Sequence, residues 1–191
     1  MTGIDAIIAE NEAATSELLA AAHAIGEAWD TPRAAGQWTP AQVVEHVSLT
    51  LEQGAAAVSG GPSRLPTFPA LLRPIARAFY YNRVLKKGVF PPTRTTSALE
   101  PAAAGATLDD ACLRLRSASR LFNDACRQRA VTGSDFAHPV FGMVSIESYA
   151  RFQALHTRHH RTQISAPHAR QGPILAALSG SCSRPAGGGP A

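Results

Sequence analysis

Two histidines four residues apart, His156 and His160, have the spacing in this chain that most clearly permits chemistry. In a helix this spacing places both imidazoles on one face, about one turn apart, where they can bind a single divalent metal ion. Such pairs are also common on solvated helix surfaces, and Arg158 and Arg161 indicate that part of this segment faces water. A metal site therefore requires a third ligand from another part of the chain.

His46 is the candidate for that third ligand. It lies in the segment V-V-E-H-V (43–47), among apolar residues and about two turns into a predicted helix. A single histidine in such a position is more often a core residue that is satisfied by one hydrogen bond. Its position alone therefore leaves both interpretations open.

Four long segments are predicted to form the helices that would position these residues. They cover about residues 4–28, 40–60, 107–130 and 145–166. The second begins with Thr39-Pro40-Ala41-Gln42, a capping box with proline in the first helical position. No segment shows a convincing strand pattern, so the sequence predicts an all-α protein, a four-helix bundle.

The connection between the second and third long helices is unusually long and rich in proline. Residues 60–106 contain seven prolines, and a short helix is predicted within them at Leu71–Lys87, with Ile75, Phe79, Tyr80 and Val84 on one side. We expect this insertion to cross over the bundle or cover one of its ends. Residues 1–178 are predicted to form the bundle, with a last turn at 174–178. The Gly- and Pro-rich tail at 179–191 is predicted to be disordered.

Charge, hydropathy and cysteine content limit the classes of function. The net charge is +4, but the basic residues are scattered and aromatic residues do not alternate with them, so no nucleic-acid partner is predicted. The densest basic patch is best explained as a solvated face, with an anionic ligand or partner as the alternative; it comprises Arg73, Arg77, Arg83, Lys86, Lys87 and Arg94.

A cytoplasmic location without membrane association is expected. No run of eighteen apolar residues is present, and the N-terminal segment does not resemble a signal peptide. The three cysteines, Cys112, Cys126 and Cys182, are an odd number without a C-x-x-C pair, which favours reduced thiols. Cys112 and Cys126 are expected to lie in or near the core.

Three motifs together resemble the DinB-like superfamily of bacterial four-helix bundles, and most closely a branch known as a domain of unknown function. They are W-T-P-A-Q-V-V-E-H-V (38–47), H-P-V-F-G (138–142) and F-Q-A-L-H-T-R-H-H-R-T-Q-I (152–164). The resemblance extends from about Asp5 to Pro167. It implies that a metal, where present, is held by one histidine of the second helix and a His-x-x-x-His pair of the last. These positions correspond to His46, His156 and His160.

Four further residues are candidates for supporting roles. His159 should lie beside the pair, outside the set of metal ligands. His138 is predicted either to line the rim of the pocket or to stabilise a turn. Gln163 and Glu45 either orient the imidazoles or lie on the surface.

Three neutral imidazoles leave coordination positions open, which is typical of a catalytic site, and zinc or nickel suits them best. Such an ion can activate water, giving a hydrolase, or a low-molecular-weight thiol, giving a thiol S-transferase. The resemblance implies both activities on a small-molecule substrate, and it implies a homodimer. The alternative is a non-catalytic bundle that binds a small ligand.

Overall fold

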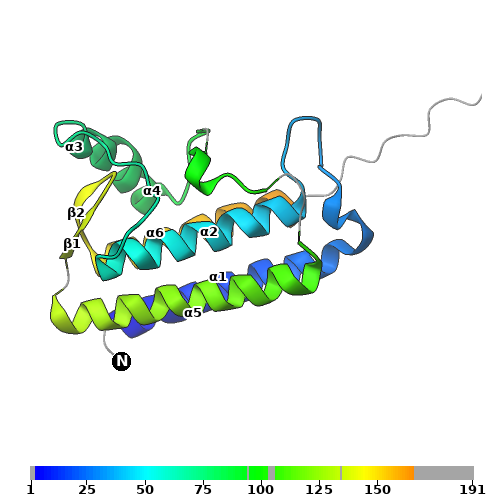
Figure 1. Cartoon of the computed structure of the whole chain (residues 1–191), viewed down its shortest axis with the longest axis horizontal. Helices are drawn as coiled ribbons and strands as arrows, with labels where there is room; N and C mark the ends of the chain where they lie inside the picture. Colours follow the sequence, from blue (N-terminus) through cyan, green and yellow to red (C-terminus); the bar gives the residue numbers. More distant parts are fainter. Residues whose placement is uncertain (1–2, 94, 103–105, 134, 166–191) are drawn as a thin grey trace, which may run out of the picture.

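The computed structural model describes residues 3–93, 95–102, 106–133 and 135–165. Four long helices form a bundle, as predicted: α1 (Gly3–Ile25), α2 (Pro40–Ser59), α5 (Leu108–Thr132) and α6 (Ile146–Ser165) (Figure 1). Short helical elements connect them: η1 (Gly26–Asp30), α3 (Arg73–Ala76), η2 (Arg77–Tyr81), α4 (Asn82–Lys87) and η3 (Ser97–Leu99). The last turn predicted at 174–178 and the tail at 179–191 lie outside the described residues, as does Cys182.

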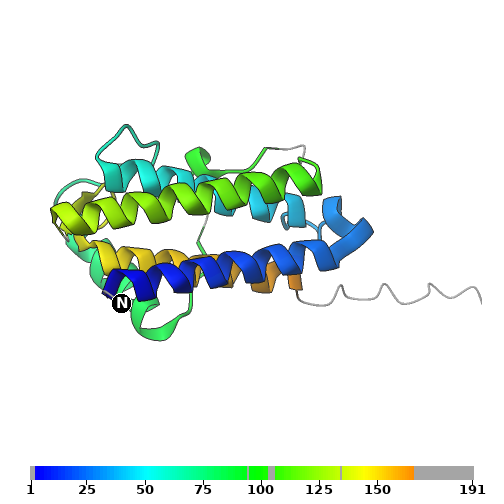
Figure 2. The same cartoon turned by 90° about the horizontal axis from the view of Figure 1, so that it is seen from below.

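The long helices pack in the order α1, α6, α2, α5 around the bundle. Helix α1 packs mainly on α6 and α2 mainly on α5, and Figure 2 shows α1 and α5 side by side. Contacts at two levels along each main pair show that its helices run parallel. Asn11 and Glu17 of α1 contact Ala150 and Arg158 of α6, and Glu45 and Gly54 of α2 lie beside Arg114 and Phe122 of α5. Because α2 and α5 run in the same direction, the chain must return along the whole bundle between them, which explains the length of the 60–106 insertion.

The ends of α1 and α2 follow from local sequence. Thr39 Oγ1 accepts a hydrogen bond from the Gln42 amide, and the Gln42 side chain accepts one from the Thr39 amide, so the predicted capping box is present. Helix α1 was expected to reach Ala28 but ends at Ile25. Gly26 adopts a left-handed φ of 59°, and this ends the α-helix before the 3₁₀ turn η1.

The insertion covers one end and one side of the bundle (Figure 1). Its helical part runs over Arg73–Lys87 and contains one π-helical turn, η2. The predicted apolar side was only partly right. Val84 is buried and Tyr80 packs partly buried against the core, but Ile75 and Phe79 are 53% and 76% exposed. Helix α4 packs on α6, whereas the described residues leave the side chains of Ile75 and Phe79 largely uncovered. Tyr81, which was not predicted, is buried.

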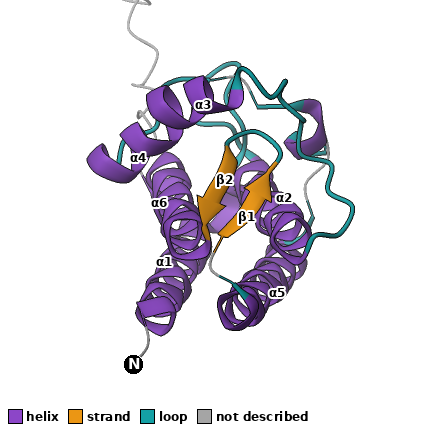
Figure 3. Ribbon diagram, turned by 90° about the vertical axis from the view of Figure 1, so that its left-hand side faces the viewer, coloured by secondary structure: helices purple, strands orange, loops and turns teal. Residues whose placement is uncertain are grey.

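A small antiparallel hairpin, β1 (Asp135–His138) and β2 (Gly142–Ser145), closes the same end of the bundle (Figure 3). The sequence showed no convincing strand pattern, so this addition to the helical fold was not predicted. Each strand has four residues, too few to show a clear alternating pattern beside Pro139. Arg77 and Arg73 of the predicted basic patch donate hydrogen bonds to the carbonyls of Met143 and Phe68. These two arginines therefore help to fix the insertion, whereas Arg94 lies outside the described residues.

All four long helices contribute to the core, and α2, α5 and α6 meet at one point in it. Phe122 of α5 and Tyr149 of α6 are fully buried, and a Cβ added to Gly54 of α2 would lie only 3.1 Å from Tyr149 Oη and 3.3 Å from Phe122. Cys112 and Cys126 are buried, as expected. None of the helices in the described ranges combines the length and the apolar character needed to span a lipid bilayer.

Candidate metal centre

His46 is held by the insertion as well as by its own helix. It lies on α2, is only 4% exposed, and has its Nδ1 2.8 Å from the carbonyl oxygen of Leu99. Because a carbonyl can only accept, Nδ1 carries the proton and Nε2 keeps its lone pair. The Trp38 ring, 4.9 Å away between centroids, packs beside the imidazole. His46 is thus oriented as a metal ligand through Nε2.

His156 and His160 lie one turn apart on α6, as their spacing predicts. His160 Nδ1 is 2.8 Å from Gln163 Oε1, an acceptor, so His160 also keeps a lone pair on Nε2. That atom lies 3.0 Å from His156 Nε2. Without a metal, one of these two Nε2 atoms must carry a proton to form a hydrogen bond with the other. A metal ion bound to the lone pairs of both Nε2 atoms would replace that proton. His156 Nδ1 is buried and has no hydrogen-bond partner.

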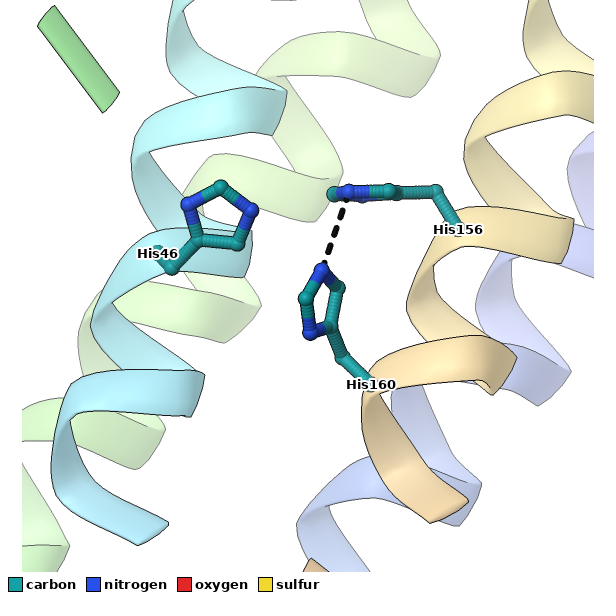
Figure 4. Close-up of side chains that lie close together, drawn as sticks. All are labelled: His46, His156 and His160. Atoms are coloured by element: carbon teal, nitrogen blue, oxygen red, sulfur yellow. Dashed lines mark hydrogen bonds between the residues drawn. The ribbon is translucent and has the colours of Figure 1, made fainter. Parts of the chain in front are cut away.

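The three imidazoles converge from two helices (Figure 4). One ring nitrogen from each of His46, His156 and His160 lies within 4.8 Å of the others. Three nitrogens bound to one tetrahedral zinc ion lie about 3.3 Å apart. The observed spacing therefore fits a three-histidine site after small side-chain adjustments.

Burial keeps these histidines neutral at pH 7. It lowers the pKa of His46, against a smaller opposing effect from the hydrogen bond to Leu99. Burial also holds the pKa of His156 well below its usual range, and the neighbouring His160 and His46 lower it further. Burial, helped by His46, lowers the pKa of His160 to about 3. A neutral imidazole is the form that binds a metal ion, so burial prepares the ligands for coordination.

A cavity of about 820 Å³ opens beside the cluster, and His46 and His160 line it. The insertion contributes much of the remaining wall, including Tyr80, Phe90 and Glu100. A volume of this size is typical of small-molecule sites. The insertion thus shapes the cavity and, through the Leu99 carbonyl, orients one of the ligands.

Gln163 and His159 both lie at this site, and they have different contacts. Gln163 accepts from His160 and thereby fixes its tautomer, as a partner of a ligating histidine commonly does. His159 lines the cavity but lies outside the three-nitrogen cluster; it packs against Phe90 and contacts the Gln163 amide. Burial lowers the pKa of His159 as well.

No hydrogen bond or ion pair joins Glu45 to an imidazole of the residues that the structure describes. Its carboxylate accepts a hydrogen bond from the Ala102 amide and forms an ion pair with Arg114. It therefore ties the insertion and α5 to α2, and the surface alternative describes it better than a role in orienting imidazoles.

His138 lies in the hairpin, where its Nδ1 accepts hydrogen bonds from the amides of Val140 and Phe141. The side chain is 3% exposed and packs between Phe141 and Tyr149. These contacts support the turn-stabilising alternative. Burial lowers its pKa to about 4.

This low pKa predicts that acid destabilises the metal-stripped protein. The unfolded chain binds a proton at His138 near pH 6.5, whereas the folded chain binds it only near pH 4, so stability is lost as the pH falls between these values. At pH 4 the protonation of His138 in the unfolded chain lowers the free energy of unfolding by roughly 3 kcal/mol. His138→Asn keeps an acceptor and removes the titration. Urea unfolding at pH 7 and pH 4.5 should show a smaller loss of stability in the variant. His156 and His160 also lose stability in acid, and they do so equally in the wild type and the variant. Equal losses in both proteins would therefore contradict a role for His138.

Two features of the site were not predicted from the sequence. The Leu99 carbonyl comes from the short 3₁₀ turn η3 and the cavity residue Arg33 from a loop, and in neither does a periodic pattern mark a side chain or carbonyl as facing a site. The length of the insertion was the only sequence signal for the role of the Leu99 carbonyl. The sequence carried no signal for Arg33.

The family profile of the DinB superfamily matches residues 9–164, from α1 to the end of the segment that carries His156 and His160. The chain belongs to the DinB superfamily. Comparison with curated proteins and with solved structures gave no match. Membership of the DinB superfamily agrees with the observed helical bundle and with the resemblance found in the three motifs. It assigns no specific activity.

Proposed function

We propose that this DinB superfamily protein is a metal-dependent enzyme that activates a small nucleophile, water or a low-molecular-weight thiol, at His46, His156 and His160. The observation that carries the proposal is the convergence of three neutral imidazoles within 4.8 Å beside a cavity. A divalent zinc or nickel ion on these three nitrogens would supply a Lewis acid that lowers the pKa of water or a thiol toward neutrality.

The residues around the cluster support a catalytic site better than a structural one. Only three ligands converge among the described residues, whereas a closed structural zinc site uses four. No carboxylate belongs to the cluster, so the ligands leave the double charge of the ion intact. The Leu99 carbonyl and the side-chain carbonyl of Gln163 accept from Nδ1 of His46 and His160, which leaves the lone pair of each imidazole on Nε2.

Neither of the two cysteines that the structure describes is placed to act as the nucleophile. Cys112 and Cys126 are buried in the core, and burial raises the pKa of both, that of Cys126 to about 12. Neither cysteine lines the cavity. The cavity, at about 820 Å³, has room for a small thiol together with a second small molecule.

Elemental analysis of the purified protein, followed by turnover assays, tests this proposal. We expect close to one equivalent of zinc or nickel per chain and metal-dependent consumption of a model electrophile. Assays with and without a small thiol separate the two nucleophiles, since turnover without thiol indicates a hydrolase. Protein that carries no metal and shows no thermal shift with Zn²⁺ or Ni²⁺ would refute the proposal.

A further inference from the structure

Arg33 is a charged residue without a charged partner in the cavity wall. It lies in the loop between η1 and α2 and is half-buried. Its Nη1 donates a hydrogen bond to the backbone carbonyl of Gln163, and its Nε is covered by protein. No ion pair links Arg33 to a carboxylate of the residues that the structure describes. A half-buried positive charge is costly unless an anion accompanies it.

The guanidinium of Arg33 is a cationic group in the cavity wall. Nη1 is engaged by the Gln163 carbonyl and Nε is covered by protein, so the guanidinium would hold a carboxylate in the cavity through its charge and its remaining N–H donors. Residue 163 also supplies the side chain that orients His160, so Arg33 is anchored to the same turn of α6 as the metal centre.

The rest of the wall defines the other part of a ligand. Aromatic rings of Trp38, Tyr80 and Phe90 line the cavity and offer apolar surface. Among the described lining residues, Glu100 also carries a charge; it is exposed, so solvent screens its repulsion of an anion. Arg33 is less exposed, so its charge is screened less.

We propose that the cavity binds a small organic carboxylate with an apolar or aromatic body, whose carboxylate pairs with the guanidinium of Arg33. This inference deepens the proposed function, because it names the substrate class for the same site. The apolar body lies against Trp38, Tyr80 and Phe90, with its other end toward His46 and His160.

The test uses the full chain stripped of metal, so that its outcome does not depend on the proposed catalysis. Binding of 3-phenylpropionate and of its neutral analogue 3-phenylpropionamide is measured by calorimetry in a buffer free of carboxylate and phosphate. We expect the carboxylate to bind roughly tenfold or more tightly than the amide, as one charge-assisted hydrogen-bonded pair provides.

Variants identify the residue responsible for that preference. Arg33→Gln should bind the two probes equally. Arg33→Lys should keep a reduced preference, because lysine keeps the positive charge but lacks the planar set of N–H donors of the guanidinium. Arg120→Gln, the same substitution at an exposed position of α5, should behave as the wild type. Circular dichroism melts check that each variant is folded.

Three results would overturn the proposal: no preference for the carboxylate in the wild type, no saturable binding of either probe, or an unchanged preference in Arg33→Gln. A clear preference for the carboxylate in a protein that binds neither Zn²⁺ nor Ni²⁺ would support the anion site and refute the metal-dependent function. Metal binding without a preference for the carboxylate would refute the anion site and leave the metal-dependent function standing.

Discussion

Replacing His160 with alanine is expected to lower the affinity for Zn²⁺ and Ni²⁺ by about two to three orders of magnitude. A structural zinc ion gains about 10–16 kcal/mol from four ligands, so one ligand contributes roughly 3 kcal/mol. His160 also shares the 3.0 Å contact with His156, so its loss removes the nitrogen nearest to a second ligand. Competition with a chromophoric chelator measures the affinity, and the metal-induced rise in melting temperature should fall with it.

His159→Ala is the matched control, because it removes an imidazole one residue away that lines the cavity but lies outside the cluster. Its effect should stay within about tenfold, the scale of a residue that acts through another side chain, here Gln163. His46→Ala should behave like His160→Ala although it lies on another helix. Equal affinities in wild type and His160→Ala would show that the metal binds elsewhere.

Phe122→Ala is expected to lower the free energy of unfolding by about 3–5 kcal/mol, the usual cost of removing a buried aromatic ring. Phe122 is fully buried on α5, packs edge-to-face on Tyr149 of α6 and lies beside Gly54 of α2. Because Gly54 has no side chain that could move into the space, the cavity left by the ring should collapse little. Urea unfolding of the metal-stripped protein at pH 7 measures the loss.

Leu121→Ala gives the comparison on the same helix, since Leu121 is the preceding residue and is 56% exposed. It should cost less than about 1 kcal/mol. Similar losses for the two variants would mean that the three helices do not meet at Phe122 as described.

Much of the fold could be predicted from the sequence because its signals are local. The box at Thr39 and Gln42 defines the start of α2, and Thr107 caps α5 by accepting from the Asp110 amide. Apolar periodicity identifies the buried sides of the long helices. The hairpin at 135–145 was missed because its turn depends on the buried ring of His138, a residue with no turn preference of its own.

The direction of the helices was decided by tertiary packing. The sequence shows a long connection at 60–106, but only contacts at two levels along each helix pair show that α2 runs parallel to α5 and α1 to α6. The exposure of Ile75 and Phe79 has the same origin. An apolar pattern marks a side that can be buried, whereas burial requires a neighbour that the pattern does not specify.

By itself the sequence determined the helices and the shared face of His156 and His160, because both follow from hydrogen bonds and spacing within a few residues. The family resemblance, rather than spacing, joined His46 to the pair. Only the tertiary structure brought the nitrogens of the three histidines within 4.8 Å, and only it placed the Leu99 carbonyl and Arg33 around them. The physical reason is distance along the chain: Leu99 is 53 residues from His46, and Arg33 is 130 residues from Gln163. No local rule relates residues so far apart, so helix packing alone sets their geometry.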